Sequence, residues 1–309
     1  MTLAMSPDTL SVLARDMLSG LKPRAKSLIV TVYGDAILPH GGTALLSDLI
    51  SMMELFGIGE RVVRTAVFRL VQDEILTARQ IGRRSIYSLT ENGRQDFDAA
   101  QRRIYAPARS REMTGEPWQI ALLTSTINST EREALRKALG WAGYGAFGPQ
   151  VLLGIGGDLG GAKQELAHLG LEDRVALFEA APDSAAMTLR ALCREAWDLE
   201  KTDTAYRAFV EGFMPVLDIL ENTRETLAPD TAFLLRVLMI HVYRRALLRD
   251  PGLPSGIMPE AWSGRRATEL TARIYTLLKQ PAQAYLENTI NGVDGALPPP
   301  AESYFSRFQ

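Results

Sequence analysis

The residues best suited to recognising a ligand lie between Gly59 and Leu89, where cationic and aromatic side chains recur at helical spacing. A guanidinium group can donate two hydrogen bonds to a guanine edge, and an α-helix fits the major groove of DNA. The candidate DNA contacts on this helix are Arg61, Arg64, Thr65, Phe68 and Arg69. Their types and spacing predict a surface that reads base pairs of double-stranded DNA.

A second pair of arginines, Arg83 and Arg84, follows at the tip of an expected hairpin. Two β-prone runs, EILTARQI and SIYSLT, flank the GRR turn. A basic hairpin tip can neutralise DNA phosphates without reading the sequence. The alternative is that these charges only solvate an ordinary surface. Phe68 either packs beneath the hairpin or contacts a thymine methyl group.

The surrounding elements must position these side chains. Apolar spacing predicts helices over residues 24–38, 43–56 and 60–73, separated by the breaks PHGG and GIG. The apolar face of the third helix consists of Val63, Ala66, Val67 and Leu70. Two helices, a turn, a third helix and a basic hairpin follow the order of a winged helix-turn-helix. We therefore expect a winged-helix DNA-binding domain over residues 21–105.

The charge of the chain is unevenly distributed. Residues 1–111 contain 15 Lys and Arg against 11 Asp and Glu, so their net charge is about +4. The whole chain of 309 residues has a net charge of −2, which leaves about −6 for the remainder. Because residues 1–111 are mildly basic and the remainder is acidic, we expect a contact with a polyanion only in residues 1–111.

The composition argues against several other classes of protein. With 46% hydrophobic residues the chain can fill two or three cores. One cysteine and three histidines, without zinc-binding spacing, favour a reducing cytoplasmic setting and no metal site. The most apolar helix is interrupted by Arg236, so neither a membrane span nor secretion is indicated.

The middle of the chain, residues 112–183, alternates strands and helices. Strand, helix, two short strands, helix and strand predict a small ferredoxin-like βαββαβ unit that serves as a connector or dimerisation piece. A dinucleotide-binding loop is the rival interpretation of VLLGIGGDLGGAK. Its spacing fails because the third glycine would have to stand at Leu159. No Walker lysine, GxSxG turn or useful carboxylate pair is present, so we expect no catalytic residues and no enzyme.

Residues 184–292 repeat apolar side chains every three or four positions and predict an α-helical bundle. The bundle core is a common place for a ligand. The tail over residues 293–309 contains a proline run that cannot continue a helix, and we expect an extended or partly disordered end. The expected fold class is therefore multidomain α+β.

Two blocks of sequence carry a family resemblance. The first consists of VYGD, GG, GIGERVVRTAVFRLV and GRRSIYSLT, and the second is RRALLRDPGLPSGIMPEAWSGRRA over residues 244–267. Together they resemble the PaaX family of bacterial repressors over most of residues 21–290. Gly59 stands where relatives tend to have serine, and Ile257-Met258-Pro259 replaces a leucine-leucine-proline run.

The resemblance implies a ligand-responsive, DNA-binding transcriptional repressor of phenylacetate catabolism. Such a protein leaves its operator when phenylacetyl-CoA, or a related aryl-CoA, binds as effector. The resemblance also implies a central unit akin to Cas2 nucleases. Because one winged helix covers few base pairs, we expect a homodimer on an inverted repeat. The implied effector contacts are Trp197, Tyr206, His241, Arg244, Arg245 and Trp262. Each of these residues has the alternative of being an ordinary packing residue.

Two other classes of function stay open. An enzyme or sensor acting on another acyl-CoA thioester would share the effector pocket, and turnover of the thioester would reveal the enzyme. A non-specific architectural protein would bind DNA without sequence preference and would ignore acyl-CoA.

Overall fold

The computed structural model describes residues 7–107, 117–141, 143–156, 159–181, 186–222, 227–253, 258–259, 261–293 and 295–309. The fold is α+β, and the described residues contain a three-stranded and a four-stranded antiparallel sheet. The chain divides into two compact units. Unit 1 consists of Met1–Ala108, Phe209–Arg244 and Arg266–Gln309, and unit 2 of Arg109–Ala208 and Arg245–Arg265.

This division differs from the one expected from the sequence. Most of the C-terminal helical residues belong to the same compact unit as the N-terminal residues, instead of forming a domain of their own. The physical reason is a buried cluster of polar side chains, described below, that draws residues from three distant segments of the chain into one core.

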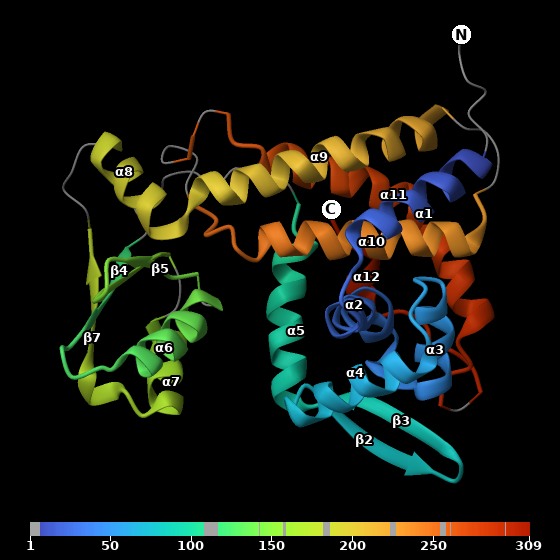
Figure 1. Ribbon diagram of the computed structural model, residues 1–309, viewed down its shortest axis with the longest axis horizontal. Coiled ribbons are helices and arrows are strands. Elements are labelled where there is room, and N and C mark those ends of the chain that lie inside the picture. The colour runs from blue at the N-terminus through green and yellow to red at the C-terminus, as the bar shows by residue number, and fades with distance from the viewer. Residues whose placement is uncertain are drawn as a thin grey trace. The chain divides into compact units, whose positions relative to one another are not determined.

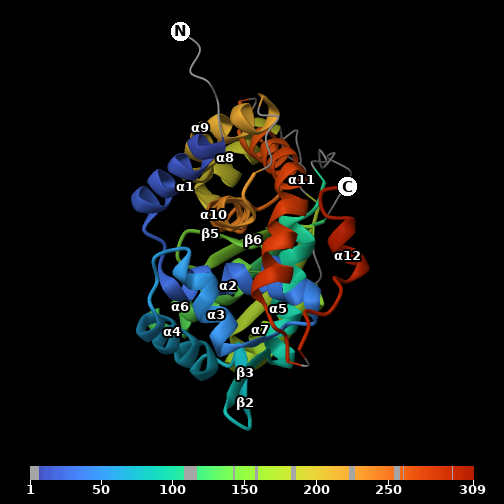
Figure 2. The ribbon, with the colours of Figure 1, turned by 90° about the vertical axis from the view of Figure 1, so that its right-hand side faces the viewer.

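Unit 1 begins with the elements that carry the candidate DNA contacts (Figures 1 and 2). Its N-terminal elements are α1 (Pro7–Leu21), α2 (Ala25–Val32), the π-helical turn η1 (Tyr33–Ile37), the 3-10 turn η2 (Leu38–His40), β1 (Thr43–Leu45), α3 (Leu46–Glu54), α4 (Glu60–Gln72), β2 (Leu76–Ile81), β3 (Arg84–Leu89) and α5 (Glu91–Ile104). Its remaining residues come from α9 (Leu199–Asn222), α10 (Pro229–Leu247), α11 (Gly264–Thr289) and α12 (Glu302–Phe305).

Helix α4 forms because its apolar residues follow the period of an α-helix. The side chains expected on its inner face are buried, which confirms that part of the sequence interpretation. They are Val63, Ala66, Val67 and Leu70. The helix begins after Gly59, which has extended backbone angles, and ends at Gln72, close to the expected bounds.

The hairpin that follows α4 also forms as the sequence predicts. Strands β2 and β3 pair in antiparallel register, and Ile81 opposite Arg84 is the last pair before the turn. Gly82 takes the turn position with φ of 59°, in the left-handed region that glycine adopts without strain. The hairpin projects beyond α4 in both ribbon views (Figures 1 and 2).

The prediction of a helix over residues 43–56 was partly wrong. Thr43–Leu45 form strand β1, which pairs with β3, and the helix begins only at Leu46. The edge of β3 that faces away from β2 has backbone groups that need hydrogen-bond partners, and β1 supplies them. Ala44 pairs with Tyr87, and Leu45 pairs with Ile86. The sheet order in unit 1 is therefore β1-β3-β2.

The first expected helix also differs in detail. Regular α-helix ends at Val32, and Tyr33–Ile37 widen into a π-helical turn. Side chains from distant segments use the carbonyl groups of this turn. Arg307 Nη2 and Gln101 Nε2 donate to Gly34 O at 3.1 and 3.2 Å, and Arg307 Nη1 donates to Asp35 O at 2.9 Å.

A buried polar cluster gathers around the side chain of Asp35. Arg236 Nε donates to Asp35 Oδ2 at 2.8 Å, and both side chains are fully buried. Tyr105 and Tyr275 donate their hydroxyl groups to Asp35 Oδ1 at 2.8 and 3.2 Å. Burial raises the pKa of both tyrosines above the ordinary range, so their hydroxyl groups stay protonated as donors. Arg307 Nη1 lies 3.4 Å from Asp35 Oδ1.

The end of the C-terminal tail packs on this cluster. Residues 297–301 form no helix or strand, as the proline run predicts, but Glu302–Phe305 form the short helix α12, so the expectation of an extended end was only partly right. Tyr304 on α12 is buried, and Arg236 Nη1 donates to its hydroxyl group at 3.1 Å. Arg307 is 6% exposed. Its guanidinium carbon lies 3.8 Å from the centre of the Tyr105 ring. Figure 2 shows α12 alongside α5 and α11.

Unit 2 contains the four-stranded sheet. Its elements are β4 (Trp118–Leu123), α6 (Ser129–Trp141), β5 (Gly145–Phe147), β6 (Val151–Ile155), α7 (Leu159–Leu169), the 3-10 turn η3 (Glu172–Arg174), β7 (Val175–Ala180), α8 (Ala186–Trp197) and the start of α9. The strand order is β5-β6-β4-β7.

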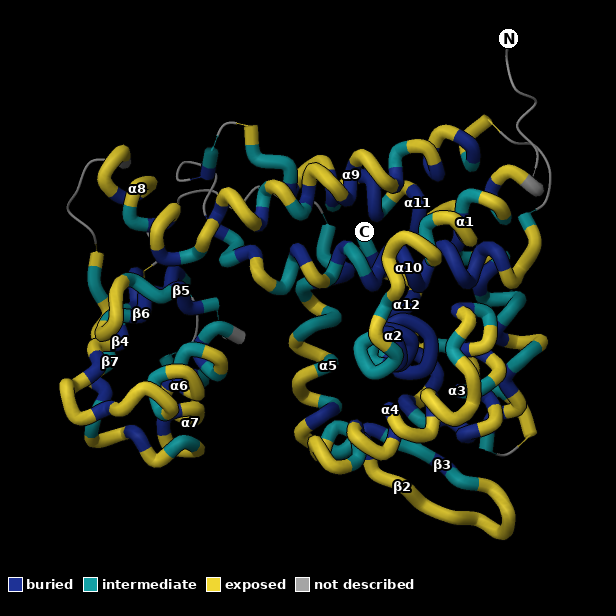
Figure 3. The backbone as a smooth tube through the Cα atoms, viewed as in Figure 1, coloured by how far each residue is buried: buried dark blue, intermediate teal, exposed yellow. Residues whose placement is uncertain are grey.

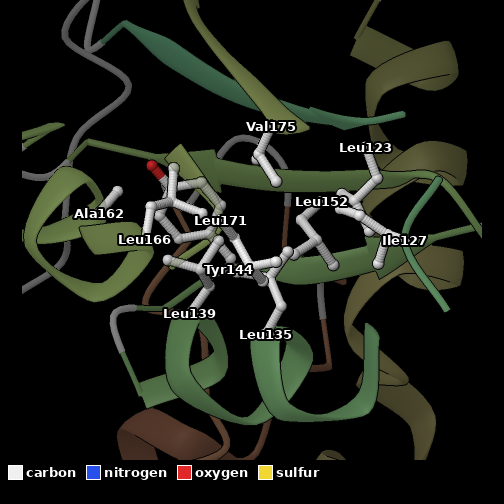
Figure 4. Packing of buried hydrophobic residues seen from close by; sticks show 11 residues of the cluster. Leu123, Ile127, Leu135, Leu139, Tyr144, Leu152, Ala162, Leu166, Leu171 and Val175 are labelled. Carbon is white, nitrogen blue, oxygen red and sulfur yellow. The ribbon is translucent and has the colours of Figure 1, made fainter. Parts of the chain in front are cut away.

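One face of this sheet packs against α6 and α7 through a cluster of buried apolar side chains (Figure 4). The other face contributes Trp118, Leu153 and Ile155 to a second cluster with residues of α8. Alternate residues of β4 and β6 point to opposite faces, as the period of a strand requires. The strands and helices expected here therefore form, and the central strands β4 and β6 contribute side chains to two cores on opposite faces of the sheet.

Asn128, the residue before α6, caps the start of this helix. Asn128 Oδ1 accepts a hydrogen bond from the Glu131 amide at 2.9 Å, and the Asn128 amide donates to Glu131 Oε2 at 3.0 Å. This reciprocal pair is a capping box. Arg174 also donates to Glu131, which lowers the pKa of that carboxyl group.

Asn128→Ala should therefore destabilise unit 2 by about 0.5–2 kcal/mol, since it leaves an amide at the helix start without its acceptor. All four tryptophans of the chain lie in the residues of unit 2, so tryptophan fluorescence during denaturant unfolding measures this unit. Ser129→Ala is the matched control and should change the midpoint little. A larger effect of Ser129→Ala than of Asn128→Ala would contradict the assignment of the cap.

Candidate nucleic-acid interface

The outer face of α4 is open to solvent (Figure 3). The five candidate contacts on this helix, Arg61, Arg64, Thr65, Phe68 and Arg69, are all exposed. Phe68 is 60% exposed, so it does not pack beneath the hairpin. Of the two alternatives for Phe68, packing beneath the hairpin is therefore wrong, and the contact with a thymine methyl group stays a prediction.

Backbone and ion-pair contacts hold the helix in place without using the outer face. Lys26 on α2 pairs with Asp73, which ends α4. Thr65 Oγ1 donates to the Arg61 carbonyl at 2.9 Å, so its methyl group and its remaining acceptor capacity are left for a ligand. A helix that exposes cationic, polar and aromatic side chains on one face is suited to insertion into a groove.

The tip of the hairpin carries the second pair of arginines in an open position. Arg83 and Arg84 are both exposed, and Figure 3 shows the turn between β2 and β3 in the colour of exposed residues. Together with Arg64 they line a cleft of about 520 Å³ between the start of α3, the first turn of α4 and the hairpin tip. The other residues lining the cleft are Leu45, Leu46, Ser47, Ile50, Ser51, Glu60 and Ser85. The arrangement brings arginines from helix and hairpin to one cleft.

Arg64 has an acidic neighbour that the sequence interpretation missed. Its Nε donates to Glu60 Oε1 at 2.8 Å, and its Nη2 lies 2.6 Å from the same oxygen. Both side chains remain more than half exposed. The available signal was the spacing, because a Glu four residues before an Arg on a helix commonly forms such a pair.

The residues expected to contact the effector fall into two separate groups. In unit 2, Tyr206 and Trp262 contact each other edge to face with ring centres 5.7 Å apart. Trp197 donates its indole N–H to the Gly143 carbonyl at 3.0 Å and packs against the same apolar cluster as Trp262. Arg245 is exposed. These aromatic residues lie together around one core.

Tyr206 also fixes the loop after α10 within unit 2. Its hydroxyl group donates to Asp250 Oδ2 at 2.9 Å, and the Gly252 amide donates to Asp250 Oδ1 at 2.8 Å. The carboxylate therefore holds both the ring and the loop backbone.

The other two effector candidates belong to unit 1 and have structural partners there. His241 is buried, and its Nδ1 lies 2.9 Å from Thr31 Oγ1. Arg244 donates from Nε to Thr31 Oγ1 at 2.9 Å and from Nη2 to Ser27 O at 2.8 Å. These contacts join α10 to α2. Two nitrogen atoms of the Arg244 guanidinium group are therefore already engaged within unit 1.

The loop VLLGIGGDLGGAK lies partly outside the described residues, at positions 157–158. Within the described residues, Gly154 faces the Tyr144 ring, and a Cβ atom at this position would lie 3.2 Å from it. This glycine therefore serves close packing inside unit 2. Among the described helices, the longest apolar stretches fall short of what a membrane crossing requires.

Comparisons with known proteins match both ends of the chain to one family. A family profile described as PaaX-like protein matches residues 24–93, and a profile described as PaaX-like protein C-terminal domain matches residues 197–288. The first range contains all seven candidate DNA contacts. The second contains the six candidate effector contacts.

Two relatives extend these matches to most of the chain. The chain is 34% identical to the transcriptional repressor PaaX of Escherichia coli strain K12 over 284 residues, covering 91% of this chain and 89% of that protein. The solved structure of the uncharacterized protein Rv0674 from Mycobacterium tuberculosis shares its fold, with a TM-score of 0.51 and 22% identity. That likeness covers 84% of this chain and 97% of the other. On the first of these relationships, together with the two profiles, the chain belongs to the PaaX-like protein family.

Proposed function

We propose that this protein is a transcriptional repressor that binds operator DNA of phenylacetate catabolism genes and is released by phenylacetyl-CoA. The observation that carries the proposal is the exposed arginine face of α4, which stands beside the two exposed arginines of the hairpin tip. The family membership and the repressor from Escherichia coli support the same function.

In this proposal the N-terminal part of unit 1 acts as a winged helix. Helix α4 enters the major groove, where Arg61 and Arg64 read base edges and Phe68 contacts a thymine methyl group. The hairpin β2–β3 is the wing, and Arg83 and Arg84 contact phosphates. The order of strands and helices in unit 2 supports a ferredoxin-like arrangement, since β4, α6, β5, β6, α7 and β7 follow one another as βαββαβ.

One winged helix covers few base pairs, so the proposed repressor is a homodimer on an inverted repeat. The protein would act in the cytoplasm, where the operator lies. It has no catalytic role in this proposal, and phenylacetyl-CoA is an effector that is not consumed.

For the effector we propose the aromatic group of unit 2 as the place for the phenyl ring. Trp197, Tyr206 and Trp262 gather around one core there, and Arg245 is exposed on the same unit. His241 and Arg244 are engaged by Thr31 and Ser27, so their proposed part is to transmit the binding event through α10 to α2.

Phenylacetyl-CoA should weaken binding to an operator duplex by at least about tenfold, since release requires the ligand to favour a form that does not bind DNA. The measurement is fluorescence anisotropy of a promoter duplex at two salt concentrations, with and without the thioester. Quenching of tryptophan emission over the same concentration range would place the ligand in unit 2, because all four tryptophans lie there.

Free coenzyme A and acetyl-CoA are the controls, because they lack the phenyl ring. Ligand binding that leaves the operator affinity unchanged would overturn the proposed switch. Cleavage of the thioester, measured afterwards, would indicate an enzyme, and equal affinity for all duplexes would indicate an architectural protein.

A further inference from the structure

We propose that Glu60 is a specificity-determining residue of the DNA-binding surface, whose carboxylate keeps Arg64 directed at base edges and disfavours its capture by phosphates. This inference rests on the proposed function and deepens it. It starts from the composition of the cleft beside α4, where Glu60 is the one acidic residue among the lining residues and three arginines line the same cleft.

Glu60 occupies the first position of α4, at the end of the helix nearest the cleft. Residues at the N-terminal end of a recognition helix are the ones that reach base edges in helix-turn-helix proteins. Arg64 stands one turn further along on the same side. Glu60 and Arg64 are therefore placed to approach the same part of a duplex together.

The geometry of the pair fixes the direction of the guanidinium group. Arg64 Nε and Nη2 lie 2.8 and 2.6 Å from the same oxygen, Glu60 Oε1. Two contacts to one oxygen define the plane of the guanidinium group more closely than one contact would. An arginine that is already oriented loses less conformational freedom when it forms a two-hydrogen-bond contact with guanine.

The exposure of the pair shows that this hold is reversible. The side chains of Arg64 and Glu60 are 57% and 56% exposed. Exposed ion pairs contribute little to stability because water and salt screen them. Arg64 can therefore exchange part of its contact with Glu60 for a contact with DNA at small cost.

The carboxylate discriminates between the two kinds of DNA contact. A phosphate that approaches Arg64 also approaches Glu60, and two like charges in one cleft repel each other. A base edge presents no formal charge, and the amino group of cytosine donates to a carboxylate. Glu60 therefore penalises contacts that carry no sequence information and permits those that do.

A merely structural role for Glu60 makes a different prediction. An acidic residue in the first turn stabilises a helix through its dipole, and any helix would benefit in the same way. Glu91 provides the matched control, because it is the exposed first residue of α5 in the same unit. It accepts a hydrogen bond from Gln95, four residues later, as Glu60 does from Arg64. Glu91→Gln removes the same charge from the same kind of position.

The test compares the wild type, Glu60→Gln, Glu60→Asp and Glu91→Gln. The wild type first selects a duplex from a randomised pool, and binding is then measured on that duplex and on a shuffled one at several salt concentrations. The variant Glu60→Gln should bind the shuffled duplex about three- to tenfold more tightly. The ratio of its affinities for the selected and the shuffled duplex should fall about tenfold. The slope of log affinity against log salt should steepen by about 0.9, the value for one more phosphate contact.

Glu60→Asp keeps the charge and should retain most of the discrimination, whereas Glu91→Gln should change neither ratio nor slope. The inference is overturned if Glu60→Gln changes the affinity for both duplexes by the same factor, or if it behaves as Glu91→Gln does. If the wild type enriches no sequence, the proposed function fails and this inference fails with it. If the wild type enriches a sequence that Glu60→Gln still distinguishes equally well, only the inference about Glu60 fails.

Discussion

Replacing Asp35 with alanine should lower the free energy of unfolding of unit 1 by about 3–5 kcal/mol, because it leaves two buried arginines without their carboxylate partner. Asp35 accepts hydrogen bonds from Arg236, Tyr105 and Tyr275 and lies 3.4 Å from Arg307. Arg236 Nη2 is already buried without a hydrogen-bond partner among the described residues. The substitution would therefore leave the positive charges of Arg236 and Arg307 buried without the carboxylate that compensates them.

Denaturant unfolding followed by far-ultraviolet circular dichroism measures this effect, since unit 1 holds many of the helices. Tryptophan emission, confined to unit 2, serves as an internal reference in the same sample. Asp98→Ala, an exposed aspartate of α5, is the control for loss of one carboxylate and should change the midpoint little. A loss below about 1 kcal/mol for Asp35→Ala would contradict a structural role for the cluster.

Arg64→Ala and Arg83→Ala should impair DNA binding in two different ways. If Arg64 makes a two-hydrogen-bond contact with guanine, its loss should cost about 1–3 kcal/mol on the cognate duplex and much less on a shuffled duplex. Arg83 lies at the exposed hairpin tip. Its loss should weaken binding to both duplexes alike and reduce the slope of log affinity against log salt concentration by about one.

Anisotropy titrations of both variants on both duplexes, at several salt concentrations, separate the two roles. Arg61→Ala should behave as Arg64→Ala does, and Arg84→Ala as Arg83→Ala does. Arg102→Ala, at an exposed arginine of α5, removes one positive charge elsewhere in unit 1 and is the control for net charge. Equal losses on cognate and shuffled DNA for Arg64→Ala would count against base reading by α4.

The sequence was most informative where local periodicity decides the structure. Val63 and Leu70 could be assigned to the core, and Arg61 and Arg64 to the surface, because a helix of 13 residues presents them on opposite sides. The hairpin followed from turn chemistry at Gly82. The strand at Thr43–Leu45 escaped prediction because its only signal was the free edge of β3, which is a tertiary property.

The buried cluster had no local signal at all. Asp35 and Arg236 lie 201 residues apart, and Asp35 and Arg307 lie 272 apart, so no spacing rule connects them. Two hints were present, an aspartate within an apolar helix and an arginine within the most apolar helix of the chain. Buried charges are generally paired, but the sequence does not name the partner.

The candidate site shows the same contrast. Seven cationic, polar and aromatic residues could be placed on one surface from the sequence, because they belong to two adjacent elements. Glu60 was overlooked although its spacing from Arg64 predicts a pair. The candidate effector contacts came only from family resemblance. The structure distributes them over two units, because contacts between segments distant in sequence decide where each side chain lies.

The spacing within the Asp35 cluster sets an order for assembly during synthesis. The segment Arg109–Ala208 supplies the whole four-stranded sheet of unit 2 and emerges before Arg236 and Arg307. Asp35 is synthesised early, but its partners Arg236 and Arg307 are added to the chain much later, so the cluster forms only near the end of synthesis. The N-terminal residues around Asp35 are translated first but reach their final packing late. A nascent chain that stops before Arg236 would lack both buried arginine partners of Asp35.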